Sequence, residues 1–148
     1  MSLRSWLDSH WLVEHTTSAR EVADLLEVVD RDLADASIDG LSADWRMGIA
    51  YNAALQLATL ALAAAGYRPG RDRAHERAIQ SLRYTIALDQ PTIDTLDGVR
   101  RKRNISHYER AGTTSHGEAA EVHEIASHLR TAIRSWLERE HPELLHDR

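Results

Sequence analysis

The sequence contains no cysteine among its 148 residues. This absence excludes disulfide bonds, thiolate metal sites and a cysteine nucleophile, and it fits a reducing compartment such as the cytoplasm. A chain of this length buries about 70% of the surface that its unfolded form exposes, so one core can form without covalent cross-links. We therefore expect a single cytoplasmic domain.

Several common functional motifs are missing as well. The chain has no glycine-rich phosphate loop, no nucleophile elbow and no Ser/His/Asp arrangement, and no cofactor is predicted. Its first residues lack the charged region and apolar core of a secretory signal, so no signal peptide is expected. No segment of useful length alternates apolar and polar residues as a half-buried strand does. These absences favour an all-α fold.

Residues 47–67 carry no charge at all. The run is long enough to cross a bilayer, but eight of its residues are alanine, and Asn52 and Gln56 lie in its middle. Its hydrophobicity is therefore weak for a membrane span. A helix that is apolar on every side must be covered on every side. We predict that the helix near 43–65 is the buried centre of a soluble bundle, with no membrane association.

Helix start and stop signals occur in order along the chain. Capping boxes begin at Ser18 and Ser115, Ser42 can cap the apolar helix, and Gly66 suits its left-handed end. Apolar stripes between these signals predict helices that cover approximately 18–40, 42–66, 72–88, 91–112 and 115–140. Short links favour antiparallel packing. The sequence thus predicts a single-domain antiparallel bundle of about five main helices.

The predicted bundle occupies residues 17–140. Residues 1–16 form an extension in which Leu3, Leu7 and Trp11 indicate a short helix with one apolar side. Residues 141–148 are expected to fray. Trp45, at the start of the apolar helix, is expected to pack against the core.

Positive charge is concentrated in one segment. The net charge is −5, yet residues 100–103 are four consecutive cations. At helical spacing Arg100, Arg103, Asn104 and His107 project from one face. Guanidinium groups suit phosphate oxygens, and an imidazole suits proton transfer near neutral pH. The alternative interpretation is a solvated basic turn with a surface histidine.

This face could cleave RNA. Arg100 or Arg103 would stabilise the phosphate and His107 would accept the proton of the substrate's own 2′-hydroxyl, so no metal is required. Arg101 and Lys102 point to other sides of a regular helix. We interpret them as general attraction for an anion or as solubilising charges.

The order Arg-Arg-Lys-Arg-Asn-x-x-x-Tyr at 100–108 follows an alanine-rich helix that carries Tyr51-Asn52-Ala53-Ala54. This combination resembles the HEPN superfamily of small helical bundles over roughly residues 17–140. The resemblance implies a homodimer and a metal-independent ribonuclease of the toxin–antitoxin or defence kind, often encoded beside a small nucleotidyltransferase. The active site of that family is an Arg, often followed by Asn, and then a His after four to six intervening residues.

Two registrations of this motif fit the sequence. Arg103-Asn104 matches the Arg-Asn pair, but four intervening residues lead to Tyr108, which keeps its proton to about pH 10 and is no base. Arg100 with six intervening residues, or Arg101 with five, leads to His107. The first registration favours a catalytically inactive dimer that binds a nucleotidyltransferase, RNA or a nucleotide. The second favours an endoribonuclease.

Asn52 and Gln56 are polar residues on one side of the apolar helix. We interpret them as a satisfied buried amide pair. The alternative is that they reach the basic helix, where they would orient Arg103 or His107.

Several histidines and acids follow residue 115 and resemble a metal cluster. The nearest motif, His123-Glu124-x-x-x-His128, has one residue too many to place both histidines as zinc proteases do, so no metal site is predicted. We expect these residues, together with His116 and Glu121, to form a polar outer face.

Overall fold

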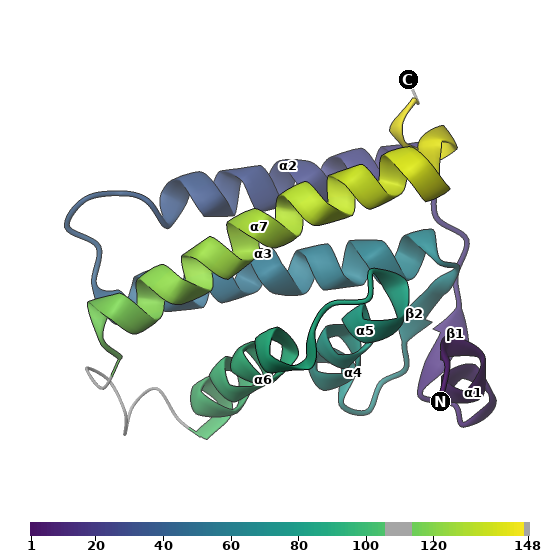
Figure 1. The fold of residues 1–148 in the computed structure, drawn as a ribbon, viewed down its shortest axis with the longest axis horizontal. Helices are drawn as coiled ribbons and strands as arrows, with labels where there is room; N and C mark the ends of the chain where they lie inside the picture. The colour runs from purple at the N-terminus through teal and green to yellow at the C-terminus, as the bar shows by residue number, and fades with distance from the viewer. Residues whose placement is uncertain (106–113, 147–148) are drawn as a thin grey trace.

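The computed structural model describes the backbone of residues 1–105 and 114–146 and the side chains of 1–102 and 114–146 (Figure 1). Helices dominate this part of the chain, so the all-α fold class is confirmed. The elements in chain order are α1 (Leu3–Asp8), β1 (Leu12–Glu14), α2 (Ala19–Asp35), α3 (Ala43–Ala64), β2 (Tyr67–Pro69), α4 (Ala74–Gln80), α5 (Leu82–Thr85), α6 (Gln90–Ile105), α7 (His116–Glu140) and the 3-10 helix η1 (Pro142–Leu145).

Helix α3 is the centre of the fold, as the lack of charge over residues 47–67 predicts. It packs against α2 and α7 along its length and against α4, α5 and α6 on another side (Figure 1). Many of its alanine side chains are fully buried, among them Ala50, Ala53, Ala54, Ala58 and Ala61. Small side chains let neighbouring helices approach closely on every side. The helix is long and apolar enough to cross a membrane, but its burial within the bundle accounts for the same composition.

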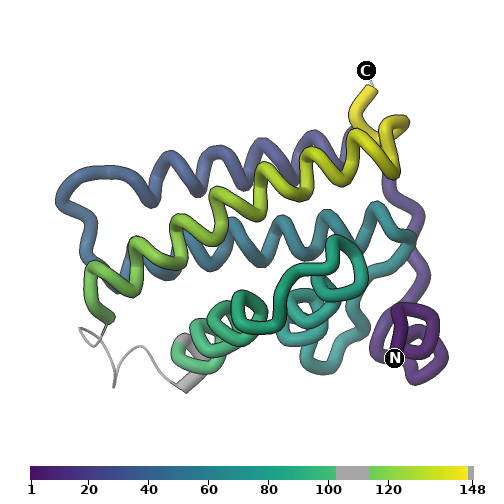
Figure 2. The backbone as a smooth tube through the Cα atoms, viewed as in Figure 1, coloured from purple at the N-terminus to yellow at the C-terminus, as the bar shows by residue number. Residues whose placement is uncertain are grey.

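The long helices do not all run antiparallel. Helices α2 and α3 are antiparallel neighbours, whereas α7 runs in the same direction as α3 (Figure 2). The reason is topological, because α4, α5 and α6 bring the chain back to the end of the molecule at which α3 began.

Helices α2 and α7 begin at the predicted capping serines. Ser18 Oγ accepts a hydrogen bond from the backbone N–H of Glu21 at 3.1 Å. Ser115 and Glu118 form a reciprocal capping box, with N–O distances of 2.9 and 3.0 Å. These contacts satisfy donors that the first turn of a helix leaves unpaired.

The predicted helix over 72–88 is two shorter helices, α4 and α5. Ser81 lies between them, fully buried, and its hydroxyl donates to the carbonyl oxygen of Ala78 at 2.7 Å. Serine side chains that bond to nearby backbone groups compete with regular helix geometry. The next helix contains Pro91 in its first turn, as predicted.

A two-stranded antiparallel sheet, which the sequence analysis did not anticipate, joins β1 to β2. Its register pairs Leu12 with Pro69 and Glu14 with Tyr67. Strands of three residues are too short to show an alternating pattern, so only tertiary proximity specifies them. Gly66 precedes β2 with φ of +104°, which confirms the predicted left-handed end of α3.

Helix α1 exists, but its buried side differs from the expectation. It ends at Asp8, and Trp6 is the side chain that it buries, with 4% exposure. Leu3, Leu7 and Trp11 are half-buried, and Trp11 lies beyond the end of the helix.

Trp45 and the carboxyl terminus also differ from their predictions. Trp45 is 68% exposed, because the core side of this end of α3 is occupied by Ala43 and Met47, on a different face of the helix. Residues 142–145 do not fray. They form η1, from which Leu144 and Leu145 pack against the main core.

Candidate functional site: the basic end of helix α6

Helix α6 is fixed to the bundle by one apolar face. Ile93, Leu96 and Val99 are buried, at the helical spacing that places them on one side. The helix packs against α3 on this side and against α4 and α5 next to it. The basic segment, residues 100–103, therefore continues a firmly held helix.

Arg100 is enclosed by carboxylates. Its Nε donates to Asp97 Oδ1 at 2.8 Å, and its NH2 atom lies 3.9 Å from Glu76 Oε1 on α4. Only 16% of the Arg100 side chain is exposed. The hydrogen bond that Arg100 donates to Asp97 raises the pKa of Arg100 above its usual value, against the opposing effect of burial. The structure thus places Arg100 as a link between α6 and α4 rather than as an open phosphate ligand.

Arg101 has the opposite environment. Its side chain is 65% exposed, and its nearest carboxylate oxygen, Asp97 Oδ2, lies 3.5 Å from NH1. Asp97 itself is largely buried, but it keeps its shorter bond to Arg100, so the exposed guanidinium of Arg101 can turn toward another anion without leaving Asp97 unpaired. Arg101 is therefore the arginine of the basic segment, among those whose side chains are described, that is open to a ligand.

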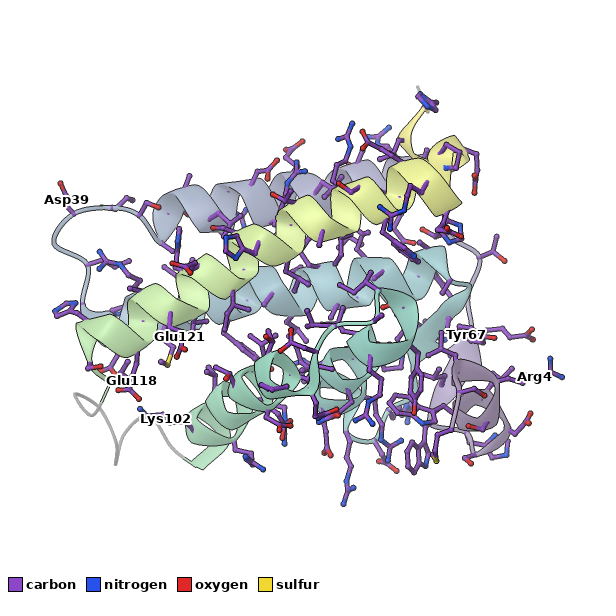
Figure 3. The ribbon with its side chains drawn as sticks, in the orientation of Figure 1. Arg4, Asp39, Tyr67, Lys102, Glu118 and Glu121 are labelled. Carbon is purple, nitrogen blue, oxygen red and sulfur yellow. The ribbon has the colours of Figure 1, made fainter. Side chains whose placement is uncertain are left out.

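Lys102 connects the end of α6 to the start of α7. Its Nζ lies 3.7 Å from Glu118 Oε2, and Figure 3 shows the two side chains at the same end of the molecule. The pKa of Glu118 is lowered by its hydrogen bonds with Ser115 and, less strongly, by the charge of Lys102. Lys102 is 29% exposed, so its charge still faces solvent in part.

The remaining predicted site residues are only partly covered by the structure. Arg103 and Asn104 belong to the last turn of α6, and their side chains lie outside the described residues. His107 and Tyr108 also lie outside the described residues. The predicted face of Arg100, Arg103, Asn104 and His107 is therefore described at Arg100 alone.

Asn52 contacts α2. Its Nδ2 donates to Asp32 Oδ2 at 2.7 Å, and Asp32 is itself buried. This bond replaces the expected Asn52–Gln56 pair, and the described contact does not reach α6. The neighbouring Tyr51, 1% exposed, is close enough to Arg100 to help raise the pKa of that guanidinium.

Sequence reasoning missed the carboxylates around Arg100. Asp97 stands three residues before Arg100, a spacing that brings helical side chains together, so a signal for this pair was present. Glu76 gave no such signal, because its proximity depends on how α4 packs against α6.

The histidines after residue 115 do not assemble into a metal site. No group of three or more metal-binding side chains occurs among the residues that the structure describes. His123 is half-buried rather than on an outer face, and its Nε2 lies 3.1 Å from both Ser37 Oγ and the carbonyl oxygen of Leu33. This histidine joins α7 to the end of α2.

No protein-family model, curated protein or solved structure matches this chain. The contrast between the enclosed Arg100 and the exposed Arg101 is the main indication of function among the described residues of the basic segment.

Proposed function

We propose that this chain is a HEPN-like, homodimeric and metal-independent endoribonuclease, of the toxin or defence kind, that acts in the cytoplasm. In this proposal Arg101 and Arg103 bind the RNA phosphate and His107 is the general base. The observation that carries it is the exposure of Arg101 beside an Arg100 that is largely buried and already bonded to Asp97.

The different exposure of Arg100 and Arg101 bears on which of them pairs with His107 in the HEPN pattern. The spacing that pairs Arg100 with His107 would use a guanidinium already bonded to Asp97 at 2.8 Å. The spacing that pairs Arg101 with His107, with five intervening residues, uses an exposed guanidinium and stays within the HEPN pattern. The structure thus supports a registration that keeps a histidine in the place of the base.

The chemistry needs only groups that the chain and RNA supply. His107 would remove the proton of a 2′-hydroxyl, and the 2′-oxygen would attack the adjacent phosphorus. The bond from phosphorus to the 5′-oxygen would break, giving a 2′,3′-cyclic phosphate and a 5′-hydroxyl that takes up a proton. Fixed guanidinium charges would stabilise the extra negative charge on the phosphate oxygens as the reaction proceeds.

A two-fold dimer would strengthen this site. An isologous interface near the basic segment would bring two copies of residues 100–103 to one cleft and double its positive charge. We expect sedimentation at micromolar concentration to give a dimer. A monomer under these conditions would contradict this part of the proposal.

A second candidate follows from Tyr108. If Arg103 and Tyr108 occupy the family positions, the protein is a catalytically inactive module that binds a nucleotidyltransferase partner, RNA or a nucleotide. Its basic segment would then attract the ligand without cleaving it.

Cleavage of single-stranded RNA by the purified protein separates the two candidates. We expect wild-type protein to cleave in the presence of a strong chelator and to leave cyclic phosphate ends that mass spectrometry identifies. His107→Ala should lower the rate by about 10²–10⁴-fold. Arg139→Gln, on an exposed arginine of α7, is the control and should cleave like wild type. Wild-type protein that binds RNA but does not cleave it would favour the inactive module.

A further inference from the structure

A second positively charged site lies outside the basic segment, in a pocket of about 250 Å³ between α1, α4 and α5. Three aromatic and three basic side chains line it: Trp6, Trp11, Tyr84, Arg73, Arg77 and Arg83. One acid, Glu76, borders the same space. The lining therefore has an excess of positive charge and suits an anion.

Arg77 is the most unusual residue of this pocket. It is 9% exposed, and its guanidinium carbon lies 3.7 Å from the centre of the Trp11 ring. Among the residues that the structure describes, no carboxylate lies within 4 Å of this guanidinium and no side-chain hydrogen bond reaches it. A charge that is buried without a counter-ion is costly, and a bound anion removes that cost.

The direction of the Arg77 pKa shift agrees with a buried guanidinium that lacks a counter-ion. Burial lowers its pKa most, and the nearby positive charge of Arg73 lowers it further, against the smaller opposing effects of Glu76 and Asp72. The positive charges of Arg73 and Arg77 thus repel each other across the pocket. A phosphate that contacts both would turn this repulsion into attraction for the ligand.

Glu76 does not neutralise the pocket. Its Oε1 lies 3.9 Å from Arg73 Nε and also 3.9 Å from the NH2 atom of Arg100 on α6. One carboxylate is shared between two arginines, and Arg73 remains 68% exposed. Arg83, which bonds to the amide oxygen of Gln80, adds a further charge near the Tyr84 ring.

The aromatic wall distinguishes this pocket from a simple anion site. The Trp6 ring lies 5.4 Å from both the Trp11 and the Tyr84 ring, in tilted and edge-on arrangements. Trp6 is 4% exposed, and the Arg77 guanidinium covers one face of the Trp11 ring. Tyr84 and the exposed Arg83 plane are therefore the surfaces of this lining on which an unpaired base can stack. The volume is below the range of about 300–1,000 Å³ for sites that enclose drug-sized ligands, so the pocket holds part of a nucleotide and leaves the rest on its rim.

We propose that this pocket binds a single nucleotide, with the base on Tyr84 and Arg83 and the phosphate on Arg77 and Arg73. The ligand is either a free mononucleotide or the terminal nucleotide of an RNA strand, since both present the same base and phosphate. The site is separate from the basic segment of α6, and the inference does not depend on ribonuclease activity.

Titration of the full chain with AMP, followed by calorimetry and tryptophan fluorescence, tests this site. We expect saturable binding with quenched fluorescence, and weaker binding of inorganic phosphate and of adenosine, each of which lacks one half of the ligand. If a 5′-phosphorylated oligoribonucleotide binds more tightly than AMP, the ligand is the end of an RNA strand. If the oligoribonucleotide does not compete with AMP for the pocket, the ligand is a free nucleotide.

Substitutions of single arginines test whether AMP binds in this pocket. Arg77→Gln should weaken AMP binding by at least about tenfold, the effect of losing one charged hydrogen bond. Arg73→Gln changes an exposed rim residue, so it should fold normally and still weaken binding. Arg139→Gln, on a distant exposed arginine, should bind like wild type.

The proposal is overturned if AMP shows no saturable binding, if inorganic phosphate binds as tightly as AMP, or if neither pocket variant weakens binding. If wild-type protein binds AMP but does not cleave RNA, the ribonuclease proposal is contradicted and the nucleotide proposal is not.

Discussion

Arg100 and Asp97 lie one turn apart on α6 and are joined by a hydrogen bond of 2.8 Å, with exposed fractions of 16% and 11%. The bond holds a charged guanidinium against the bundle, where Glu76 and Tyr51 are also near. It gives two adjacent arginines different roles, since Arg100 is held by the fold while Arg101 faces solvent.

The first prediction concerns Asp97. Asp97→Asn removes the main partner of a largely buried guanidinium, so the free energy of unfolding should fall by about 1–3 kcal/mol. Urea denaturation followed by circular dichroism measures it. The control is Asp8→Asn, which breaks an exposed pair with Arg4 and should cost less than about 1 kcal/mol. Equal effects for the two substitutions would contradict the role given to Asp97.

The second prediction separates Arg100 from Arg101. Arg101→Gln should weaken RNA binding and reduce the slope of log affinity against log salt by about 1, with little change in stability. Arg100→Gln should mainly lower stability, because it removes the closer of the two arginines paired with the largely buried Asp97 and leaves only Arg101, at 3.5 Å. Filter binding at several salt concentrations, together with urea denaturation, measures both. If Arg100→Gln changes the salt slope and Arg101→Gln does not, the assignment is reversed.

The third prediction compares two tryptophans. Trp136 is 8% exposed and belongs to the main core, so Trp136→Ala should destabilise the protein by about 3–5 kcal/mol. Trp45 is 68% exposed, and Trp45→Ala should change the stability by less than about 0.5 kcal/mol. Thermal and urea unfolding of both variants at low protein concentration provide the comparison. A large loss of stability in Trp45→Ala would mean that this side chain is covered in the folded protein.

The fourth prediction concerns acid sensitivity at Glu21. Hydrogen bonds from Thr17 and His15, the latter 2.8 Å long, lower the pKa of Glu21 below its ordinary value of 4.5. A carboxyl group whose pKa is lower in the folded state stabilises the fold above the unfolded pKa and loses this contribution as the pH falls through the folded pKa.

The stability of wild-type protein should therefore decrease below about pH 4.5 partly through Glu21. Glu21→Gln, which keeps a hydrogen-bonding side chain without the charge, should show a smaller decrease between pH 5 and pH 3. Denaturation at a series of pH values measures the difference. If the free energies of unfolding of the two proteins fall in parallel as the pH decreases, Glu21 does not contribute to acid sensitivity.

Much of the architecture follows from local sequence. The capping serines 18, 42 and 115, the left-handed Gly66 and the chargeless run of α3 depend on short-range geometry and on the need to cover an apolar helix. These features correctly predict the main helices and the buried centre, because each signal acts within a few residues of the chain.

Tertiary structure decided what sequence spacing left open. Arg100 is bonded to Asp97, which helical spacing already brings close, but its second carboxylate is Glu76, which is 24 residues earlier in the chain and reaches α6 only through the packing of α4. The aromatic pocket likewise combines α1 with α4 and α5, and the exposure of Trp45 depends on which side of α3 its neighbours cover. Helical periodicity determines which residues share a face, but only the packed fold determines what that face meets.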